Sequence, residues 1–255
     1  MSCIFITGST DGLGLAAARE LMDKGHQVVL HARSAQRTSA LADVAHRGAG
    51  IVIGDLSSAK QTRALAEQVN KLGRMDAIIH NAAAFQEPSR LPTPEGHAKT
   101  LAVNVLAPYM LTALIERPHR LIYLSSGTHG NGKAPLTDID WVERRWDPSA
   151  SYAESKFFIT ALAMAVARLW PYVLSNAVDP GWVPTKMGGP RAPDDLVKGH
   201  LTQTWLAVSD EAEAKVSGKY WHHRKQLKPA AQTLDTKFQD QLVAMLSEMT
   251  GVSIV

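Results

Sequence analysis

Two side chains that could transfer protons, Tyr152 and Lys156, lie four positions apart in a stretch expected to be helical. Residues at this spacing share one face of an α-helix, so the phenol and the ammonium group would point into a common space. A free tyrosine has a pKa of about 10, and a nearby cation brings that pKa toward the working range of an acid/base catalyst. The same spacing is also common on solvated helix faces, so the pair needs support from the rest of the chain.

Size and composition are those of an ordinary soluble globular protein. The 255 residues are 45% hydrophobic and 20% charged, which is enough for a full core in one α/β domain. The formal net charge of +3 is dispersed, and the short basic cluster at residues 222–225 is interpreted as a solvated turn. Nucleic-acid binding is therefore not expected.

The cysteine content and the amino terminus bear on the compartment. Cys3 has no second cysteine to pair with, and we expect it to be a buried small hydrophobe in a reducing compartment. The amino terminus lacks a basic segment with a cleavage site, and no apolar stretch reaches 18 residues without a charge. These features predict a cytoplasmic protein without a membrane partner, and the sequence singles out no metal site.

A glycine-rich turn follows the first predicted strand. Residues 3–7 form a short apolar run, residues 8–14 carry the spacing Gly-x-x-x-Gly-x-Gly, and a helix with one apolar stripe then continues to Gly25. Glycines let backbone N–H groups approach a pyrophosphate, and a helix N-terminus favours its charge. The order of strand, turn and helix favours a dinucleotide site over a simple tight turn.

The end of the second predicted strand, residues 27–31, indicates which dinucleotide binds. An NAD site places an acid there to bind the ribose 2′-hydroxyl. Ala32 occupies that place, eighteen residues after Gly14, and Arg33 follows it. A guanidinium suits a 2′-phosphate and the adenine face, and Arg37 is a second candidate, so NADP(H) is favoured.

The alternation of predicted strands and helices continues through the first half of the chain. Residues 50–54 and 76–80 are predicted strands, with a helix over about 57–71 between them. Alternating elements of this length predict an α/β fold with a doubly wound parallel sheet. Ligands of such sheets bind at the carboxyl ends of the strands, which is where the sequence places Gly8, Arg33, Asp55 and Asn81.

With these features the sequence resembles a short-chain dehydrogenase/reductase, closely over about residues 2–186 and loosely beyond. The shared motifs are the glycine turn, the segment 81–83 with Ala83 where glycine is usual, and the Tyr152/Lys156 pair. The resemblance implies a single Rossmann-type domain over residues 1–255, with about seven strands and helices on both faces. It also implies a cofactor-binding half, 1–125, and a catalytic and substrate-binding half, 126–255.

The resemblance further implies which residues contact NADP(H). They follow the carboxyl ends of the strands, and the segment after the sixth strand would hold the nicotinamide carboxamide. The implied contacts are Gly8, Ser9, Thr10, Gly12, Leu13, Gly14, Arg33, Ser34, Asp55, Leu56, Asn81, Ala82, Ala83, Tyr152, Lys156, Pro180, Gly181, Val183 and Thr185.

A catalytic set is implied as well. Ser126 resembles the family's serine at the end of the fifth strand, and Asn104 resembles the helix asparagine that holds a catalytic water. Ser126 and Tyr152 would polarise a carbonyl oxygen, and Tyr152 would protonate it. Lys156 would lower the Tyr152 pKa and bind the nicotinamide ribose. A purely structural role, satisfying a neighbouring backbone group, is the alternative for Asn104.

Ser126 and the catalytic tyrosine are 26 residues apart, about twice the separation usual in the family. Such a spacing resembles the retinol-dehydrogenase-like branch and related carbonyl reductases. Residues 127–150 must then contain an excursion, with Trp141 and Trp146 on it, which we expect beside the substrate pocket. The choice between Ser125 and Ser126 stays open, with Ser126 preferred as the family's usual position.

The last third is interpreted as the substrate-binding region, which in this family closes over the substrate. A flexible turn precedes a helix over about 194–208, a last strand over 217–221 and a final helix over about 231–249. Core packing is an alternative for the last two of the candidate wall residues, which are Trp182, Met187, Leu196, Trp205 and Leu206.

The predicted helix over 151–170 has apolar residues on more than one face. Core packing explains some of them, and the resemblance attributes the rest to a homodimer or homotetramer contact, although the long excursion would also permit a monomer.

Two functions of different classes fit these observations. The first is an NADP(H)-dependent oxidoreductase acting on a carbonyl or alcohol group of a small-molecule substrate that is fairly apolar. The second is a catalytically idle NADP(H)-sensing regulatory protein, which needs only the first-half cradle and is therefore disfavoured by the full catalytic set. The sequence leaves the substrate and the physiological direction of the reaction open.

Overall fold

One eight-stranded sheet runs through the residues described by this computed structural model, 1–85, 87–132 and 135–255. Its spatial order is β3-β2-β1-β4-β5-β6-β7-β8, with β1 to β7 parallel and β8 antiparallel. The order reverses between β1 and β4, so the predicted doubly wound α/β fold is confirmed. The strands are β1 (Cys3–Ile6), β2 (Gln27–Ala32), β3 (Gly50–Ile53), β4 (Ala77–His80), β5 (Arg120–Leu124), β6 (Leu174–Asp179), β7 (Lys219–His222) and β8 (Lys225–Leu227).

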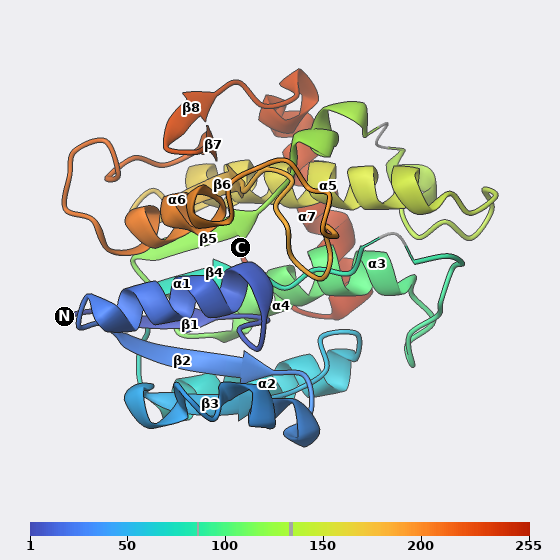
Figure 1. Cartoon of the computed structure of the whole chain (residues 1–255). Helices are drawn as coiled ribbons and strands as arrows, with labels where there is room; N and C mark the ends of the chain where they lie inside the picture. Colours follow the sequence, from blue (N-terminus) through green and yellow to red (C-terminus); the bar gives the residue numbers. More distant parts are fainter. Residues whose placement is uncertain (86, 133–134) are drawn as a thin grey trace.

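Helices cover both faces of the sheet (Figure 1). A short α3 (Lys99–Leu101) continues through a π-helical segment (Ala102–Leu106) into α4. One face carries α1 (Gly12–Asp23) and α6 (Leu196–Val208), and the other carries α2 (Ala59–Lys71), α4 (Ala107–Leu114), α5 (Pro148–Leu169) and α7 (Thr236–Thr250).

Strand β1 shows how the two layers are built. Ile4 and Ile6 pack into the apolar cluster with α1 and α6, whereas Phe5 between them packs into the cluster with α2, α4, α5 and α7. Successive side chains of a strand point to opposite faces, and both faces are covered here, so all three residues are fully buried. A strand buried on both faces appears in the sequence as a continuous apolar run.

Strand β8 is an addition to the predicted set of about seven strands. It pairs with β7 through a two-residue loop, His223 and Arg224, whose φ angles are 47° and 61°. Positive φ at both loop positions is what a type I′ hairpin turn requires, and Asn-Gly is its usual sequence. The basic cluster does form a turn as predicted, but without glycine or asparagine it carried no hairpin signal.

Helix α5 carries the Tyr152/Lys156 pair and is buried along most of its length. It begins at Pro148 because the Asp147 carboxylate accepts hydrogen bonds from the backbone of Ser149 and Ala150, and proline is favoured in the first turn. Residues 151–166 are all buried, against the sheet, the 3₁₀ segment η4 (Gly127–Asn131) and α7. Packing within one chain therefore accounts for apolar residues on more than one face.

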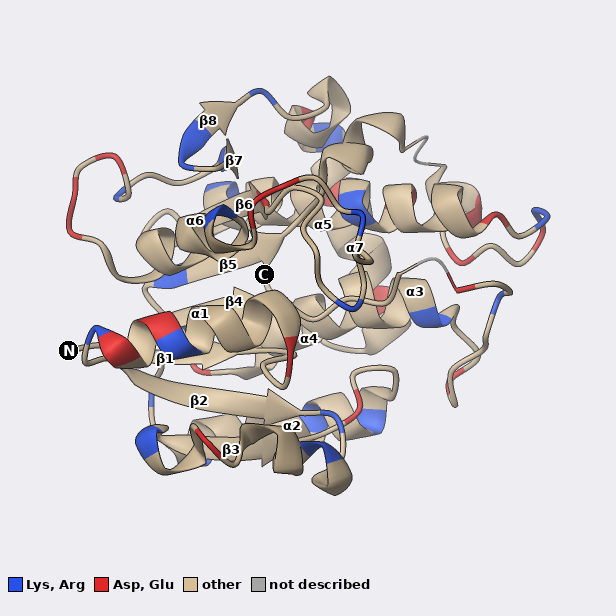
Figure 2. Cartoon of the chain, in the orientation of Figure 1, with Lys and Arg blue, Asp and Glu red and all other residues tan. Residues whose placement is uncertain are grey.

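Charged residues are interspersed over the chain, as predicted (Figure 2). Several ion pairs are at the surface, for example Arg19 with Asp43 and Arg47 with Asp23. Within the described ranges, none of the helices has both the length and the apolar character needed to cross a bilayer.

Candidate active site

A cleft of about 550 Å³ opens at the carboxyl ends of the parallel strands. Its volume lies within the range of small-molecule and cofactor sites, roughly 300–1,000 Å³. The cleft brings together most of the residues that the sequence singled out, from six separate segments of the chain. They are Gly8, Thr10, Gly12, Leu13, Arg33, Asp55, Asn81, Ala82, Ala83, Tyr152, Lys156, Pro180, Thr185 and Met187.

The glycine turn is shaped by close approach of main-chain atoms. Gly8 has a φ of 66°, and a Cβ on it would lie 3.0 Å from Ala82. A Cβ on Gly14 would lie 2.4 Å from the Gly8 carbonyl oxygen and 2.5 Å from the Asn81 amide nitrogen. A side chain at either position would therefore push the turn away from the strand ends. With glycine, backbone N–H groups at the start of α1 remain available for a pyrophosphate.

The end of β4 is tied to this turn by hydrogen bonds. The Asn81 side chain donates to the carbonyl oxygens of Thr7 (3.0 Å) and Gly8 (3.3 Å). The Thr7 hydroxyl accepts from the backbone N–H groups of Asn81 and Ala82. Asn81 therefore holds the glycine turn in register with β4.

Arginines stand where the sequence predicted a 2′-phosphate. Arg33 is exposed and lines the cleft at the end of β2. Arg37 also lines it, and its guanidinium bonds Asp11 (2.6 Å) and the Thr10 hydroxyl (3.2 Å), which connects the β2 end to the turn. Asp55 lies in the same wall, where its carboxylate accepts from the backbone and hydroxyl of Ser57.

Some predicted cofactor contacts lie outside the lining of the cleft. The Ser9 hydroxyl is fully buried between β1 and β2, where it donates to Ile6 and accepts from the backbone of His31. Leu56 belongs to the hydrophobic core. For these positions the sequence identified the segment but not which side chains face the cleft. The other residues in this group are Gly14, Ser34, Gly181 and Val183.

Tyr152 and Lys156 meet in the cleft as the helical spacing predicted. The Lys156 ammonium lies 5.5 Å from the centroid of the Tyr152 ring and donates to the Leu124 carbonyl oxygen at 2.8 Å. Lys156 is 3% exposed and Tyr152 is 9% exposed. Phe85 packs edge-on against the tyrosine ring, with centroids 4.8 Å apart.

The electrostatics of the pair differ from the sequence expectation. Burial raises the pKa of Tyr152 above its ordinary value, and a hydrogen bond with Ser126 opposes that rise only in part. Burial also lowers the pKa of Lys156 to about 8. The predicted net lowering of the Tyr152 pKa is not observed, because loss of hydration disfavours the buried phenolate more than the nearby ammonium favours it.

The two adjacent serines after β5 have different partners. The Ser126 hydroxyl acts on the Tyr152 phenol, whose pKa it lowers against the effect of burial, and it accepts from the backbone and hydroxyl of Thr128. The Ser125 hydroxyl is buried and bonds the Thr160 hydroxyl on α5 at 2.6 Å. Ser126 is therefore the serine beside the phenol.

The Asn104 side chain is fully engaged within the protein. Its amide donates to the carbonyl oxygen of Ala84 and to the Ser155 hydroxyl, and its carbonyl oxygen accepts from the Ala84 backbone. The structural alternative is thus realised for this side chain. The residue lies in the π-helical segment, and such irregular turns are frequent at functional sites because they alter the backbone hydrogen bonding.

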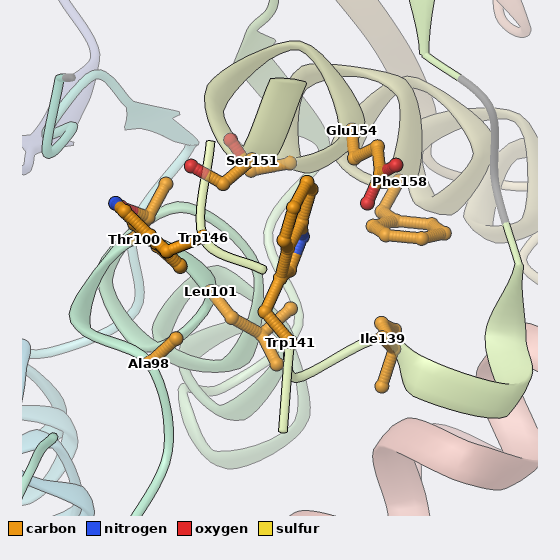
Figure 3. A pocket seen from close by; sticks show the side chains of 10 residues that line it. Ala98, Thr100, Leu101, Ile139, Trp141, Trp146, Ser151, Glu154 and Phe158 are labelled. Carbon is orange, nitrogen blue, oxygen red and sulfur yellow. The ribbon is translucent and has the colours of Figure 1, made fainter. Parts of the chain in front are cut away.

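Ile139, Trp141 and Trp146 of the excursion between Ser126 and α5 pack between α3 and α5, and its described residues do not line the cleft. Figure 3 shows Trp141 and Trp146 beside Ser151 and Glu154 of α5, around a space of about 10 Å³, roughly one water in size. Arg144 fixes this arrangement: its guanidinium bonds both Glu154 carboxylate oxygens (2.8 and 3.0 Å) and lies 3.9 Å from the Trp141 ring centroid. This ion pair holds the excursion on the helix. The Trp146 indole N–H donates to the carbonyl oxygen of Glu87, a residue that lines the cleft, so the predicted place beside the substrate pocket stays a prediction.

The candidate substrate residues separate into three cases. Met187 lines the cleft. Trp182 is 58% exposed, and its indole N–H donates to the Gly188 carbonyl oxygen. Trp205 follows the core-packing alternative and not the substrate-wall one: it packs edge-on against Trp221 in the core, and its N–H donates to Glu211. From the sequence, an aromatic residue on an amphipathic helix can be assigned either to the core or to the substrate cleft, and only the position of the helix on the sheet distinguishes the two.

Phe85 is the main site residue that the sequence reasoning missed. It follows the Asn81–Ala84 strand end directly and contacts Tyr152. Its position after that motif was the available signal. Lys99 and Glu87 also line the cleft, where they form an ion pair of 2.6 Å.

The donor set suits a dinucleotide and not a metal. A glycine cradle without Cβ atoms, an exposed arginine at the β2 end and a buried lysine match phosphates and ribose hydroxyls. Among the described residues, no group of His, Cys, Asp and Glu side chains could hold a metal ion. The fold and the cleft together are those of a Rossmann-type dinucleotide-binding protein.

Comparisons with known proteins agree with this class. The family model for short chain dehydrogenases matches residues 2–196. The chain is 40% identical to the short-chain dehydrogenase chyC of Penicillium rubens over 258 residues, which covers 100% of this chain and 99% of that protein. It is 28% identical to human retinol dehydrogenase 13, over 98% of this chain and 84% of that protein. The chain belongs to the short-chain dehydrogenase family, and it is an oxidoreductase of the retinol-dehydrogenase-like branch.

Solved structures support the fold independently. A protein of Mycobacterium paratuberculosis matches with a TM-score of 0.85 at 23% identity, over 100% of this chain and 95% of its own. A blue fluorescent protein from a metagenomic library, solved in complex with NADPH, matches with a TM-score of 0.70 at 22% identity, over 87% of this chain and 95% of its own.

Proposed function

We propose that this protein transfers hydride between NADP(H) and a carbonyl or alcohol group of a fairly apolar small molecule, with Tyr152 as the general acid. The observation that carries the proposal is that Tyr152 and Lys156 line the same cleft as the glycine turn, with Ser126 acting on the phenol. A proton donor next to a dinucleotide cradle is what carbonyl reduction needs.

The choice of NADP(H) rests on the residues at the end of β2. Ala32 offers no acid to a ribose 2′-hydroxyl, and Arg33 lines the cleft immediately beyond it. A guanidinium binds a phosphate through two charge-assisted hydrogen bonds. Lys156 would bind the nicotinamide ribose, and Pro180 and Thr185 would bind the carboxamide end. A fold neighbour that carries NADPH is consistent with this choice.

The chain's own groups supply the proton chemistry. Bound NADPH supplies the hydride that adds to the carbonyl carbon. As the π-bond pair moves to the carbonyl oxygen, the Ser126 hydroxyl stabilises the developing negative charge. The Tyr152 O–H bond breaks and its proton goes to that oxygen, after which solvent restores the phenol. The raised pKa of Tyr152 keeps this phenol protonated before each turnover.

An assay of NADPH oxidation with a panel of aldehydes and ketones tests this function. We expect turnover to favour apolar carbonyl compounds, because Phe85 and Met187 line the cleft beside the polar groups. The fluorescence of NADPH is enhanced when it binds, and the loss of that enhancement as the protein is diluted would measure cofactor binding in the same samples. NADPH binding without turnover of any panel member would contradict the proposal and point to an NADP(H)-sensing protein.

Arg33→Asp is expected to reverse the preference between the two dinucleotides. Loss of the guanidinium removes about 1.5–3 kcal/mol of charged hydrogen bonding, which raises KM for NADPH by roughly 10- to 100-fold, and the new carboxylate can accept from a ribose 2′-hydroxyl of NADH. Steady-state kinetics with both cofactors measure the change. Arg47→Asp is the matched control, because Arg47 pairs with Asp23 and does not line the cleft. An unchanged NADPH preference in Arg33→Asp would show that Arg33 does not contact the cofactor.

A further inference from the structure

Lys156 is a buried cation without a carboxylate in direct contact. Its ammonium bonds the Leu124 carbonyl oxygen, and the side chain is 3% exposed. Burial disfavours an ammonium strongly unless a negative charge compensates for the lost hydration. The site therefore needs a nearby counter-charge if Lys156 is to stay protonated.

Most acids around the cleft already have a partner. Glu87 pairs with Lys99, Asp11 pairs with Arg37, and Glu154 pairs with Arg144 behind α5. The Asp55 carboxylate accepts from the backbone and hydroxyl of Ser57. Three of these negative charges are therefore paired with a cation, and the fourth is held by Ser57.

Asp179 is different in both place and partners. It ends β6, next to β5, and Leu124 pairs with Val178 immediately before it. Adjacent strands are about 4.8 Å apart, so the carbonyl that holds Lys156 and the start of Asp179 lie at neighbouring strand ends. The Asp179 carboxylate is 13% exposed, accepts from the Gly181 backbone at 2.9 Å, and has neither lysine nor arginine among its recorded contacts.

The Asp179 carboxylate lies close to the segment that follows β5. One oxygen would lie 3.2 Å from a Cβ placed on Gly127, the residue directly after Ser126. Its negative charge raises the pKa of Lys156, against the lowering by burial, and it adds to the rise of the Tyr152 pKa that burial causes. Both effects favour the protonated form of the pair.

Other titratable groups surround Asp179 from β7, η4 and the loop beyond β6. His222 lies 3.3 Å from the carboxylate and stacks on His223. Burial lowers the pKa of His129 and raises that of Tyr220, so both are uncharged at neutral pH. The remaining acid, Asp194, accepts from the Trp182 backbone. Among these groups, His222 is the one that forms an ion pair with the Asp179 carboxylate.

We propose that Asp179 is a positioning residue that supplies the counter-charge for Lys156 and so keeps the Tyr152–Lys156 pair protonated, the state in which this site reduces a carbonyl. The inference rests on the proposed function for its catalytic meaning. It adds a role for the aspartate that precedes Pro180-Gly181, and it explains how a lysine this deeply buried holds its proton near neutral pH.

The pH profile of Asp179→Asn tests the proposal. Asparagine keeps an oxygen for the Gly181 N–H but removes the charge. For NADPH-dependent reduction, kcat/KM of the unmodified protein should fall as pH rises through about 8, where Lys156 loses its proton. In Asp179→Asn this alkaline limb should move to lower pH by about one unit. Asp179→Ser, a smaller uncharged residue, should shift it in the same direction if asparagine impairs folding.

Asp76→Asn is the matched control. Asp76 also accepts from a backbone N–H, that of Cys3 at 2.8 Å, but it precedes β4 at the amino ends of the strands. Its replacement should leave the alkaline limb in place. An alkaline limb at the same pH in Asp179→Asn, Asp179→Ser and the unmodified protein would overturn the role of Asp179.

A second measurement works without cofactor or turnover. The neutral amine of a lysine reacts with acetic anhydride and the ammonium does not, so the labelling rate of Lys156 against pH, followed by peptide mass spectrometry, reports its protonation. Exposed Lys60 on α2 provides the internal reference. Half-maximal labelling of Lys156 should move to lower pH by about one unit in Asp179→Asn, with Lys60 unchanged. If the pH of half-maximal Lys156 labelling shifts but no carbonyl compound is turned over, Asp179 remains the counter-charge and only the proposed function is contradicted. If carbonyl compounds are turned over but the labelling does not shift, only the inference about Asp179 is contradicted.

Discussion

Tyr152→Phe is expected to lower kcat for carbonyl reduction by roughly 10²- to 10⁴-fold, the usual contribution of a positioned general acid. The phenyl ring would keep its contact with Phe85 and its place near the Lys156 ammonium, since neither depends on the hydroxyl. The dissociation constant for NADPH should therefore stay within about threefold of the unmodified protein. Single-turnover kinetics with saturating NADPH separate the two effects.

Tyr109→Phe is the matched control for Tyr152→Phe, because it removes a phenolic hydroxyl elsewhere in the protein. The Tyr109 hydroxyl donates to the Val252 carbonyl oxygen in the core between α4 and the C-terminal segment, and it does not line the cleft. This control should keep its kcat and lose at most about 1.5 kcal/mol of stability. Substantial reduction by Tyr152→Phe, within tenfold of the unmodified rate, would mean that another group donates the proton.

Replacing Ser126 by alanine should cost about 10²- to 10³-fold in kcat, as the loss of one donor to a developing oxyanion does. It also removes the hydrogen bond that partly offsets the raised pKa of Tyr152, so the phenol of the variant would be still harder to ionise. We therefore expect alcohol oxidation, which requires the phenolate, to suffer more than reduction. Measuring both directions over a pH series reveals this asymmetry.

Ser125→Ala distinguishes the two adjacent serines. The Ser125 hydroxyl bonds Thr160 within the protein, so its removal should cost about 1 kcal/mol of unfolding free energy and no more than a severalfold change in kcat. Thermal unfolding and steady-state kinetics of both alanine variants make the comparison. If Ser125→Ala loses more activity than Ser126→Ala, the assignment of the catalytic serine is reversed.

The sequence by itself determined the cofactor-binding half, because its signals are local. An apolar run, glycines at fixed spacing and a helical stripe follow one another within about twenty-five residues, and each element is set by short-range sterics and periodicity. The Tyr152/Lys156 pair was predictable for the same reason, since one helical turn places both side chains. Strand–helix alternation was enough to predict the parallel sheet and the edge at which the cleft opens.

Other features depended on contacts between distant segments. The hairpin of β7 and β8 uses a His-Arg loop without the usual turn residues, so only pairing with the sheet defines it. Trp205 faces the core because Trp221 and the sheet lie on that side of α6. The excursion packs on α5 because Arg144 and Glu154 form a buried pair, and no pattern within 127–150 shows which helix would receive it.

The catalytic electrostatics were decided by tertiary structure alone. The sequence spacing placed an ammonium beside a phenol. Whether the pKa of Tyr152 falls or rises depends on how much hydration each group loses on burial. That burial follows from the packing of β5, β6 and α5. The same packing buried Ser125 against Thr160 and placed Asp179 just after Val178, the strand partner of the residue whose carbonyl oxygen holds Lys156. Residue types and spacing thus defined which chemistry the chain carries, whereas desolvation and strand register in the folded protein decided the protonation states in which that chemistry runs.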